Sequence, residues 1–81
     1  MIDSEMLDST VCNYIVRAYS EETGETVYEY IGNDYNEAKN AFLRQLQHLH
    51  LTKEINKDAT LLFEDVYEDK ILDSYNTLND A

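Results

Sequence analysis

The chain has 81 residues, of which 17 are acidic and 6 are Lys or Arg, so its formal net charge is −11 at pH 7. A chain of this length forms a single domain with one modest core, and such a charge repels nucleic acid and anionic membranes but favours basic partners. Cys12 is the sole cysteine, which excludes an internal disulfide.

Residues 1–81 are predicted to form one domain, because the chain has no proline and only two glycines to make a linker. The N-terminal stretch "MIDSEMLDST" is acidic and lacks the basic and apolar regions of a secretory signal, so the expected compartment is the cytoplasm. Residues 1–10 show no hydrophobic period and are predicted to be a flexible arm.

A β-hairpin is predicted next. The segments "VCNYIVRAY" and "TVYEYIG" are rich in β-branched and aromatic residues. Gly24, in the intervening "SEETGE", can supply the positive φ that the turn requires. We expect Cys12, Tyr14, Val16 and Ala18 to form the inner face of the first strand. If the aliphatic sides of both strands face inward, the second strand buries Val27 and Ile31, and its tyrosines lie outside.

An amphipathic helix is predicted from about Tyr35 to Leu49. Asp34 is the expected N-cap, and Glu37 three residues later completes a capping-box pattern. An apolar stripe at helical spacing follows; its members are Ala38, Ala41, Phe42, Gln45, Leu46 and Leu49.

The segment "ATLLFEDVY" is predicted to be a third strand, and an acidic turn near Glu68–Asp69 leads to a fourth strand, "KILDSYN". Residues 76–81 are predicted to fray. The expected fold is therefore α+β with the order β-β-α-β-β, in which one helix packs on a small antiparallel or mixed sheet.

The negative charge lies outside the predicted helix. Residues 1–33 carry seven acids against one base, and residues 52–81 carry eight acids against three, whereas residues 34–51 are neutral. Two interpretations remain open: a solvated acidic surface, or a surface that meets a basic protein. Solubility alone needs a net charge of only about 2–8 in a small domain.

Tyrosines beside the carboxylates favour the second interpretation, because a tyrosine offers a flat apolar body with a polar tip and is common at binding hot spots. Tyrosines also fill half-buried strand positions without any functional role. The candidate partner-binding residues are Glu21, Glu22, Glu25, Tyr28, Glu29, Tyr30, Glu64, Asp65, Tyr67, Glu68 and Asp69.

Catalytic and metal-binding motifs are missing from the sequence. None of the serines lies in a nucleophile-elbow or triad context, and there is no Gly-rich phosphate loop. His48 and His50 lie two apart on the predicted helix and point about 200° apart. We therefore expect a protein that is not an enzyme and that has no metal site and no cofactor.

In its size, its lone Cys12 and its acidic runs "SEETGE" and "FEDVYED", the chain resembles the small acidic inhibitors that bacteriophages encode, including anti-CRISPR and DNA-mimic proteins. The resemblance implies an inhibitor in the host cytoplasm whose carboxylates stand in for phosphates on a basic surface of a DNA- or RNA-handling protein. No direct contact with nucleic acid or membrane is expected. The alternative is a self-associating accessory module, with a sheet edge or the tyrosine face forming a homodimer.

Overall fold

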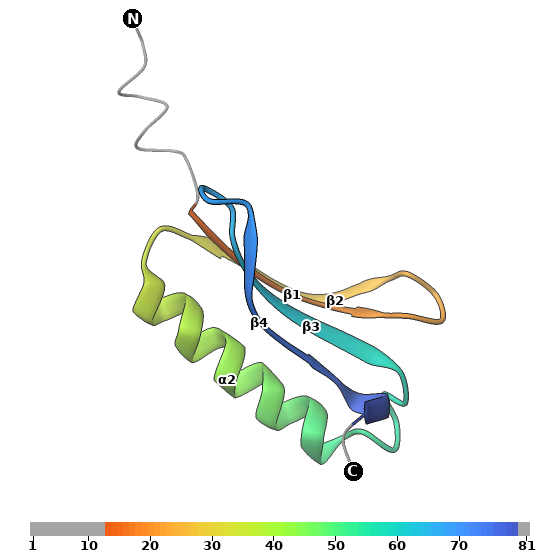
Figure 1. Cartoon of the computed structure of the whole chain (residues 1–81). Helices are drawn as coiled ribbons and strands as arrows, with labels where there is room; N and C mark the ends of the chain where they lie inside the picture. The colour runs from red at the N-terminus through yellow and green to blue at the C-terminus, as the bar shows by residue number, and fades with distance from the viewer. Residues whose placement is uncertain (1–12, 80–81) are drawn as a thin grey trace, which may run out of the picture.

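The computed structural model of the chain describes residues 13–79, so the predicted arm at residues 1–10, Cys12 and residues 80–81 lie outside the described part. The elements are β1 (Tyr14–Ser20), β2 (Thr26–Gly32), α2 (Tyr35–Leu51), β3 (Ala59–Asp65), β4 (Lys70–Asn76) and the short 3₁₀ helix η1 (Thr77–Asn79). The strands form one antiparallel sheet in the order β2-β1-β3-β4, and α2 lies against one of its faces (Figure 1). The predicted β-β-α-β-β fold is confirmed.

Helix α2 begins directly after Asp34, the predicted N-cap residue. The Asp34 carboxylate accepts hydrogen bonds from the backbone N–H groups of Asn36 and Glu37, at 2.8 and 3.3 Å. The helix ends at Leu51, two residues beyond the predicted end, and the Thr52 hydroxyl donates to the carbonyl of His48 at 2.8 Å. Both ends therefore satisfy backbone groups that a helix leaves without partners.

The core lies between α2 and the two central strands. Val16 and Ala18 of β1 and Leu61 and Phe63 of β3 are buried together with one face of the helix. The helix contributes Ala38, Ala41, Phe42 and Leu49, which confirms most of the predicted stripe. Aromatic rings close the end of the core near the helix N-terminus, where the ring centroids of Tyr35 and Phe63 lie 5.7 Å apart.

The predicted orientation of β2 is wrong. Tyr28 pairs with Ala18 and Tyr30 pairs with Val16. Because directly paired residues share a face of the sheet, both tyrosines lie on the helix side, where they are half-buried against the core. Ile31 lies on the opposite side and is 54% exposed.

A register shift in β2 also separates Val27 from Ile31. Tyr28 pairs with Ala18 but Thr26 pairs with Tyr19, so Val27 is an extra residue, a β-bulge that interrupts the alternation of side chains. Val27 lines a depression together with Ser20 and Ala59. The two aliphatic residues that were expected to share a buried side therefore do not share a side.

The two hairpin turns use left-handed residues. Gly24 has a φ of 75°, as predicted for the first turn. In the second turn Asp69 has a φ of 55°, a conformation that aspartate tolerates better than most residues. The Asp65 carboxylate accepts a hydrogen bond from the backbone N–H of Glu68 at 3.0 Å, which stabilises this turn.

The predicted fraying of the C-terminal segment needs correction for residues 76–79. Asn76 belongs to β4, and Thr77 in η1 is only 4% exposed. Its hydroxyl accepts a hydrogen bond from the backbone N–H of Ala59 at 2.9 Å. This contact fixes η1 to the start of β3 because it satisfies a donor that would otherwise be buried without an acceptor.

Candidate protein-binding surface

The face of the sheet opposite α2 is covered by no element within residues 13–79. We call it the open face, and the strand pairing assigns to it Ile15, Arg17, Tyr19, Thr26, Glu29, Ile31, Thr60, Leu62, Glu64, Ile71, Ser74 and Asn76. Three cross-strand rows run over it. The first places Ile31, Ile15, Glu64 and Ile71 side by side, and the second places Glu29, Arg17, Leu62 and Ser74 side by side. The third consists of Thr26, Tyr19, Thr60 and Asn76. The face therefore combines four aliphatic side chains, in the first two rows, with three charged ones, and its third row is polar.

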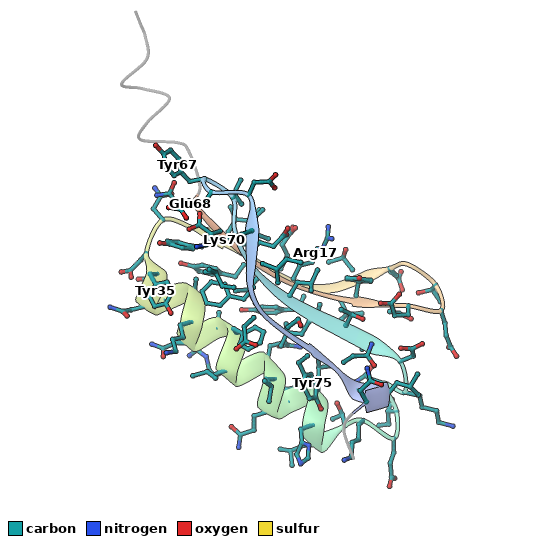
Figure 2. The ribbon with its side chains drawn as sticks, viewed as in Figure 1. Arg17, Tyr35, Tyr67, Glu68, Lys70 and Tyr75 are labelled. Atoms are coloured by element: carbon teal, nitrogen blue, oxygen red, sulfur yellow. The ribbon has the colours of Figure 1, made fainter. Side chains whose placement is uncertain are left out.

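Arg17 occupies the middle of the open face and extends from the side of the sheet away from α2 (Figure 2). Its guanidinium carbon lies 5.3 Å from the centroid of the Tyr19 ring, within the range of a cation–π contact. Its Nε is shielded from solvent and has no hydrogen-bond acceptor among residues 13–79. Arg17 thus presents a cation whose Nε donor is not used within residues 13–79.

The first acidic turn is held by backbone and side-chain hydrogen bonds. The backbone N–H of Ser20 donates to the carbonyl of Glu25 at 2.9 Å, and the N–H of Glu21 donates to the carbonyl of Asp58 at 2.8 Å. The Glu21 carboxylate accepts a hydrogen bond from the Thr60 hydroxyl. Glu22 and Glu25 are exposed. This turn therefore presents its carboxylates to solvent from a backbone that hydrogen bonds hold in place.

The second acidic turn brings four of the predicted residues together. Asp65, Tyr67 and Glu68 line a shallow depression with Asn13 and Tyr14, and Asp69 follows directly in the turn. Tyr67 is 82% exposed. Glu68 forms an ion pair with Lys70 at 3.2 Å, and both side chains are 57% exposed, so this pair contributes at most about 1 kcal/mol to folding.

The two acidic turns lie at opposite ends of the sheet. Tyr14, at the start of β1, pairs with Asp65, whereas Ser20, at the end of β1, bonds to Glu25. The seven residues of β1 span roughly 20 Å at about 3.3 Å per residue. Glu29 and Glu64 lie on the open face between the turns. The predicted carboxylates therefore form a discontinuous line along the sheet rather than one cluster.

The three predicted tyrosines do not form one cluster; they are Tyr28, Tyr30 and Tyr67. Tyr67 lies in the second turn, while Tyr28 and Tyr30 pack against the core on the helix side. The Tyr30 hydroxyl donates a hydrogen bond to the Glu37 carboxylate at 3.0 Å. Partial desolvation, together with this hydrogen bond and the negative charges of Glu37 and Asp34, raises the pKa of Tyr30 above its ordinary value of 10.0.

The exposed aliphatic residues of the open face were missed by the sequence reasoning. Ile31 and Ile71 are 54% and 57% exposed, and they lie on the two edge strands. A signal for them is present in the sequence, because Glu29 has the same strand parity as Ile31. A buried carboxylate is costly, so the Glu29 side of β2 is the one expected to face water.

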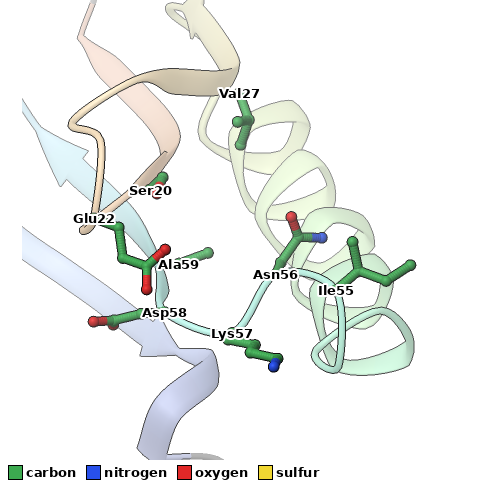
Figure 3. Close-up of a pocket in the computed structure, with 8 residues that line it drawn as sticks. All are labelled: Ser20, Glu22, Val27, Ile55, Asn56, Lys57, Asp58 and Ala59. Atoms are coloured by element: carbon green, nitrogen blue, oxygen red, sulfur yellow. The ribbon is translucent and has the colours of Figure 1, made fainter.

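A depression lies between the first turn and the segment after α2 (Figure 3). Val27, Ile55 and Ala59 supply apolar walls, and Glu22, Asn56, Lys57 and Asp58 supply polar groups. It is open to solvent, with about 350 Å³ of empty space. Within residues 13–79 there is no group of three His, Cys, Asp or Glu side chains that could hold a metal ion.

No helix among the described elements is long and apolar enough to cross a membrane. Comparisons of the chain with protein-family models, with curated proteins and with solved structures found no significant match.

Proposed function

We propose that the protein is a small acidic inhibitor that acts in the cytoplasm by occupying a basic surface of a DNA- or RNA-handling protein. The observation that carries the proposal is the line of carboxylates from the first turn, across Glu29 and Glu64, to the second turn. Arg17 is the one cation among the open-face residues. Such a surface attracts a basic partner and accelerates its association.

The spacing of the acids favours an extended basic groove as the partner's surface. The two turns lie roughly 20 Å apart, whereas each strand of duplex DNA carries one phosphate for about every 3.4 Å of helix axis. The carboxylates are thus sparser than the phosphates that they would replace. The protein would contact the groove at intervals, and binding rather than catalysis would cause the inhibition.

Paired charge variants test this proposal. The double variant Glu25→Gln/Glu29→Gln removes two carboxylates from the proposed surface. The control Glu54→Gln/Asp73→Asn removes two exposed carboxylates elsewhere and so has the same net charge. Each protein is used to capture partners from bacterial lysate at low and at high salt. The association rate of the captured partner is then measured over a range of ionic strengths.

We expect the wild type and the control to capture the same nucleic-acid-handling protein at low salt. Glu25→Gln/Glu29→Gln should bind it more slowly and with a weaker salt dependence. Equal association rates for the two double variants would mean that net charge, and not this surface, governs binding, and the proposal would be wrong.

Self-association is a second candidate function, favoured by the exposed Ile31 and Ile71 on the two edge strands. A homodimer formed through the open face would bury these side chains. The net charge of −11 on each copy opposes it. Sedimentation equilibrium over a wide concentration range tests it, since a constant monomer mass would exclude a dimer at those concentrations.

A further inference from the structure

We propose that the open face is the docking surface for a partner whose apolar patch is bordered by lysine or arginine side chains. The inference rests on the proposed function and specifies the partner's chemistry. It predicts that apolar burial supplies much of the affinity, while the acidic ends supply attraction and orientation. The partner would thus differ from a uniformly basic groove.

Four aliphatic side chains of the open face lie close together across the strands. Ile31, Ile15 and Ile71 lie in one cross-strand row, interrupted only by Glu64, and Leu62 belongs to the next row. Ile31 and Ile71 are more than half exposed. On the other side of the sheet, α2 contacts β1, β2 and β3. Exposed aliphatic side chains gathered on one face of a sheet often mark a protein interaction site.

Charge complementarity identifies the kind of partner. Glu29 lies at the β2 end of the second row, Glu64 lies within the first row, and the two acidic turns lie beyond the rows along the strands. A partner that covers the aliphatic rows would therefore meet carboxylates around its own apolar patch. Lysine and arginine at that border would pair with them, whereas acidic groups would be repelled.

Arg17, near the centre of the open face, places a second requirement on the partner's surface. Its Nε is shielded from solvent and has no acceptor among the described residues. Docking would remove more of the guanidinium from water, and an unpaired buried charge is costly. The partner's patch is therefore expected to carry a carboxylate or carbonyl oxygen opposite Arg17, within an otherwise apolar surface.

The size of the open face favours a different protein over a second copy. Four strands about 4.8 Å apart and seven residues long make a face of roughly 20 by 20 Å, about 400 Å². Two copies would then bury about 800 Å² in total, less than the roughly 1,200 Å² typical of stable interfaces. A larger partner could also contact both acidic turns and so reach that area without the repulsion between two copies of charge −11.

Two synthetic peptides provide a defined test. One combines lysine and leucine so that a helix has one leucine face, and the other carries serine in place of every leucine. Binding to the full chain is measured by titration calorimetry at physiological salt. The variants are Ile71→Glu and Ile31→Glu on the open face, and the control is Leu43→Glu on α2, where the native side chain is 49% exposed. All three variants add the same charge.

We expect the lysine–leucine peptide to bind the native protein at least about tenfold more tightly than the lysine–serine peptide. Ile71→Glu and Ile31→Glu should each weaken binding of the lysine–leucine peptide about tenfold, although they add an attractive charge. Leu43→Glu should leave binding unchanged or slightly tighter. Circular dichroism checks that each variant is folded. Because Ile31 and Ile71 lie on different edge strands, a local distortion of one strand would not explain a loss in both variants.

Four outcomes would overturn the inference. Equal losses in Leu43→Glu and the open-face variants would show that the open face is not the docking surface. Equal affinities for the two peptides would show that apolar burial contributes nothing, and only the charge-based proposed function would remain. If neither peptide bound, the proposed function would fail as well. A native dimer that Ile71→Glu converts to a monomer would assign the open face to a second copy.

Discussion

The Tyr30 hydroxyl donates a hydrogen bond to the Glu37 carboxylate at 3.0 Å and so connects edge strand β2 to the first turn of α2. Because Tyr30 points to the helix, its neighbours Glu29 and Ile31 point to the opposite side of the sheet. This one contact therefore helps to orient the open face.

Replacing Tyr30 with Phe tests that contact. The pKa of Tyr30 is raised by desolvation and by the Glu37 carboxylate, so the folded state holds the phenolic proton more tightly than the unfolded state. The resulting stabilisation is present below about pH 10 and is lost as the pH rises through the folded-state pKa. We expect Tyr30→Phe to be less stable at neutral pH and to lose less stability than the native protein above pH 10.

Denaturant unfolding at several pH values measures this difference, and ultraviolet absorbance monitors phenol ionisation. Tyr67→Phe is the control for the loss of one phenol, since Tyr67 is 82% exposed in a turn. If the absorbance titration of Tyr30→Phe matched the native curve above pH 10 in everything but amplitude, the raised pKa of Tyr30 would be contradicted.

Gly32→Ala should displace the Tyr30 ring. A Cβ atom built on Gly32 would overlap the Tyr30 hydroxyl and lie 2.8 Å from Cζ. Because the ring packs against the core, we expect a loss of about 1–3 kcal/mol in unfolding free energy. The loss should shrink when Tyr30 is also replaced by alanine, as a double-mutant cycle by urea unfolding would reveal.

Gly24→Ala is the matched comparison for that cycle. Gly24 has a φ of 75° and no atom within 4 Å of an added Cβ. Its replacement should cost about 1–2 kcal/mol through backbone strain alone, and the cost should not depend on Tyr30. Coupling of Gly24→Ala, but not of Gly32→Ala, to the Tyr30 substitution would refute the steric explanation.

Phe42→Ala is expected to remove most of the stability of this small domain. Phe42 is 1% exposed, and its ring stacks on that of Phe63 with centroids 5.8 Å apart. Loss of a buried phenylalanine typically costs about 3–5 kcal/mol. Its neighbour Leu43 is 49% exposed, so Leu43→Ala should change stability by no more than about 0.5 kcal/mol. Similar thermal midpoints for the two variants would be inconsistent with the described core.

Thr77→Val tests whether η1 is part of the folded domain. The substitution keeps the shape of the side chain but removes the oxygen that accepts from the Ala59 backbone N–H. A buried donor without an acceptor costs about 1–3 kcal/mol. The change should also speed hydrogen exchange at Ala59, whereas Leu78→Ala, at a 68% exposed position, should not. Unchanged exchange at Ala59 in Thr77→Val would indicate that the contact contributes nothing.

The helix and the hairpin turn could be predicted because their signals are local. The Asp34 cap, the stripe through Phe42, and Gly24 each act within a few residues, and each was found where expected. The orientation of β2 could not be decided by its apolar residues, since both of its sides carry large ones. Glu29 could have decided the orientation, because its carboxylate is expected to face water.

The separation of the acidic turns depends on strand order, which local patterns do not specify. Only the pairing of β1 with both β2 and β3 places the first and second turns at opposite ends of the sheet. The same pairing places Ile15 beside Ile31, and the pairing of β3 with β4 adds Ile71 to that row. The identity of the candidate carboxylates could therefore be predicted from the sequence, but their arrangement in a line along the sheet could not.

The most direct test of the central claim is amide chemical-shift mapping of the ¹⁵N-labelled protein during titration with the lysine–leucine peptide. We predict the largest shifts at Ile15, Leu62 and Ile71 on the open face, with smaller shifts at both acidic turns. The exposed side of α2 carries its own shallow depression, which Asn40, Leu43 and Gln47 help to line. If the largest shifts occurred there and the open face remained unchanged, the open face would not be the binding surface.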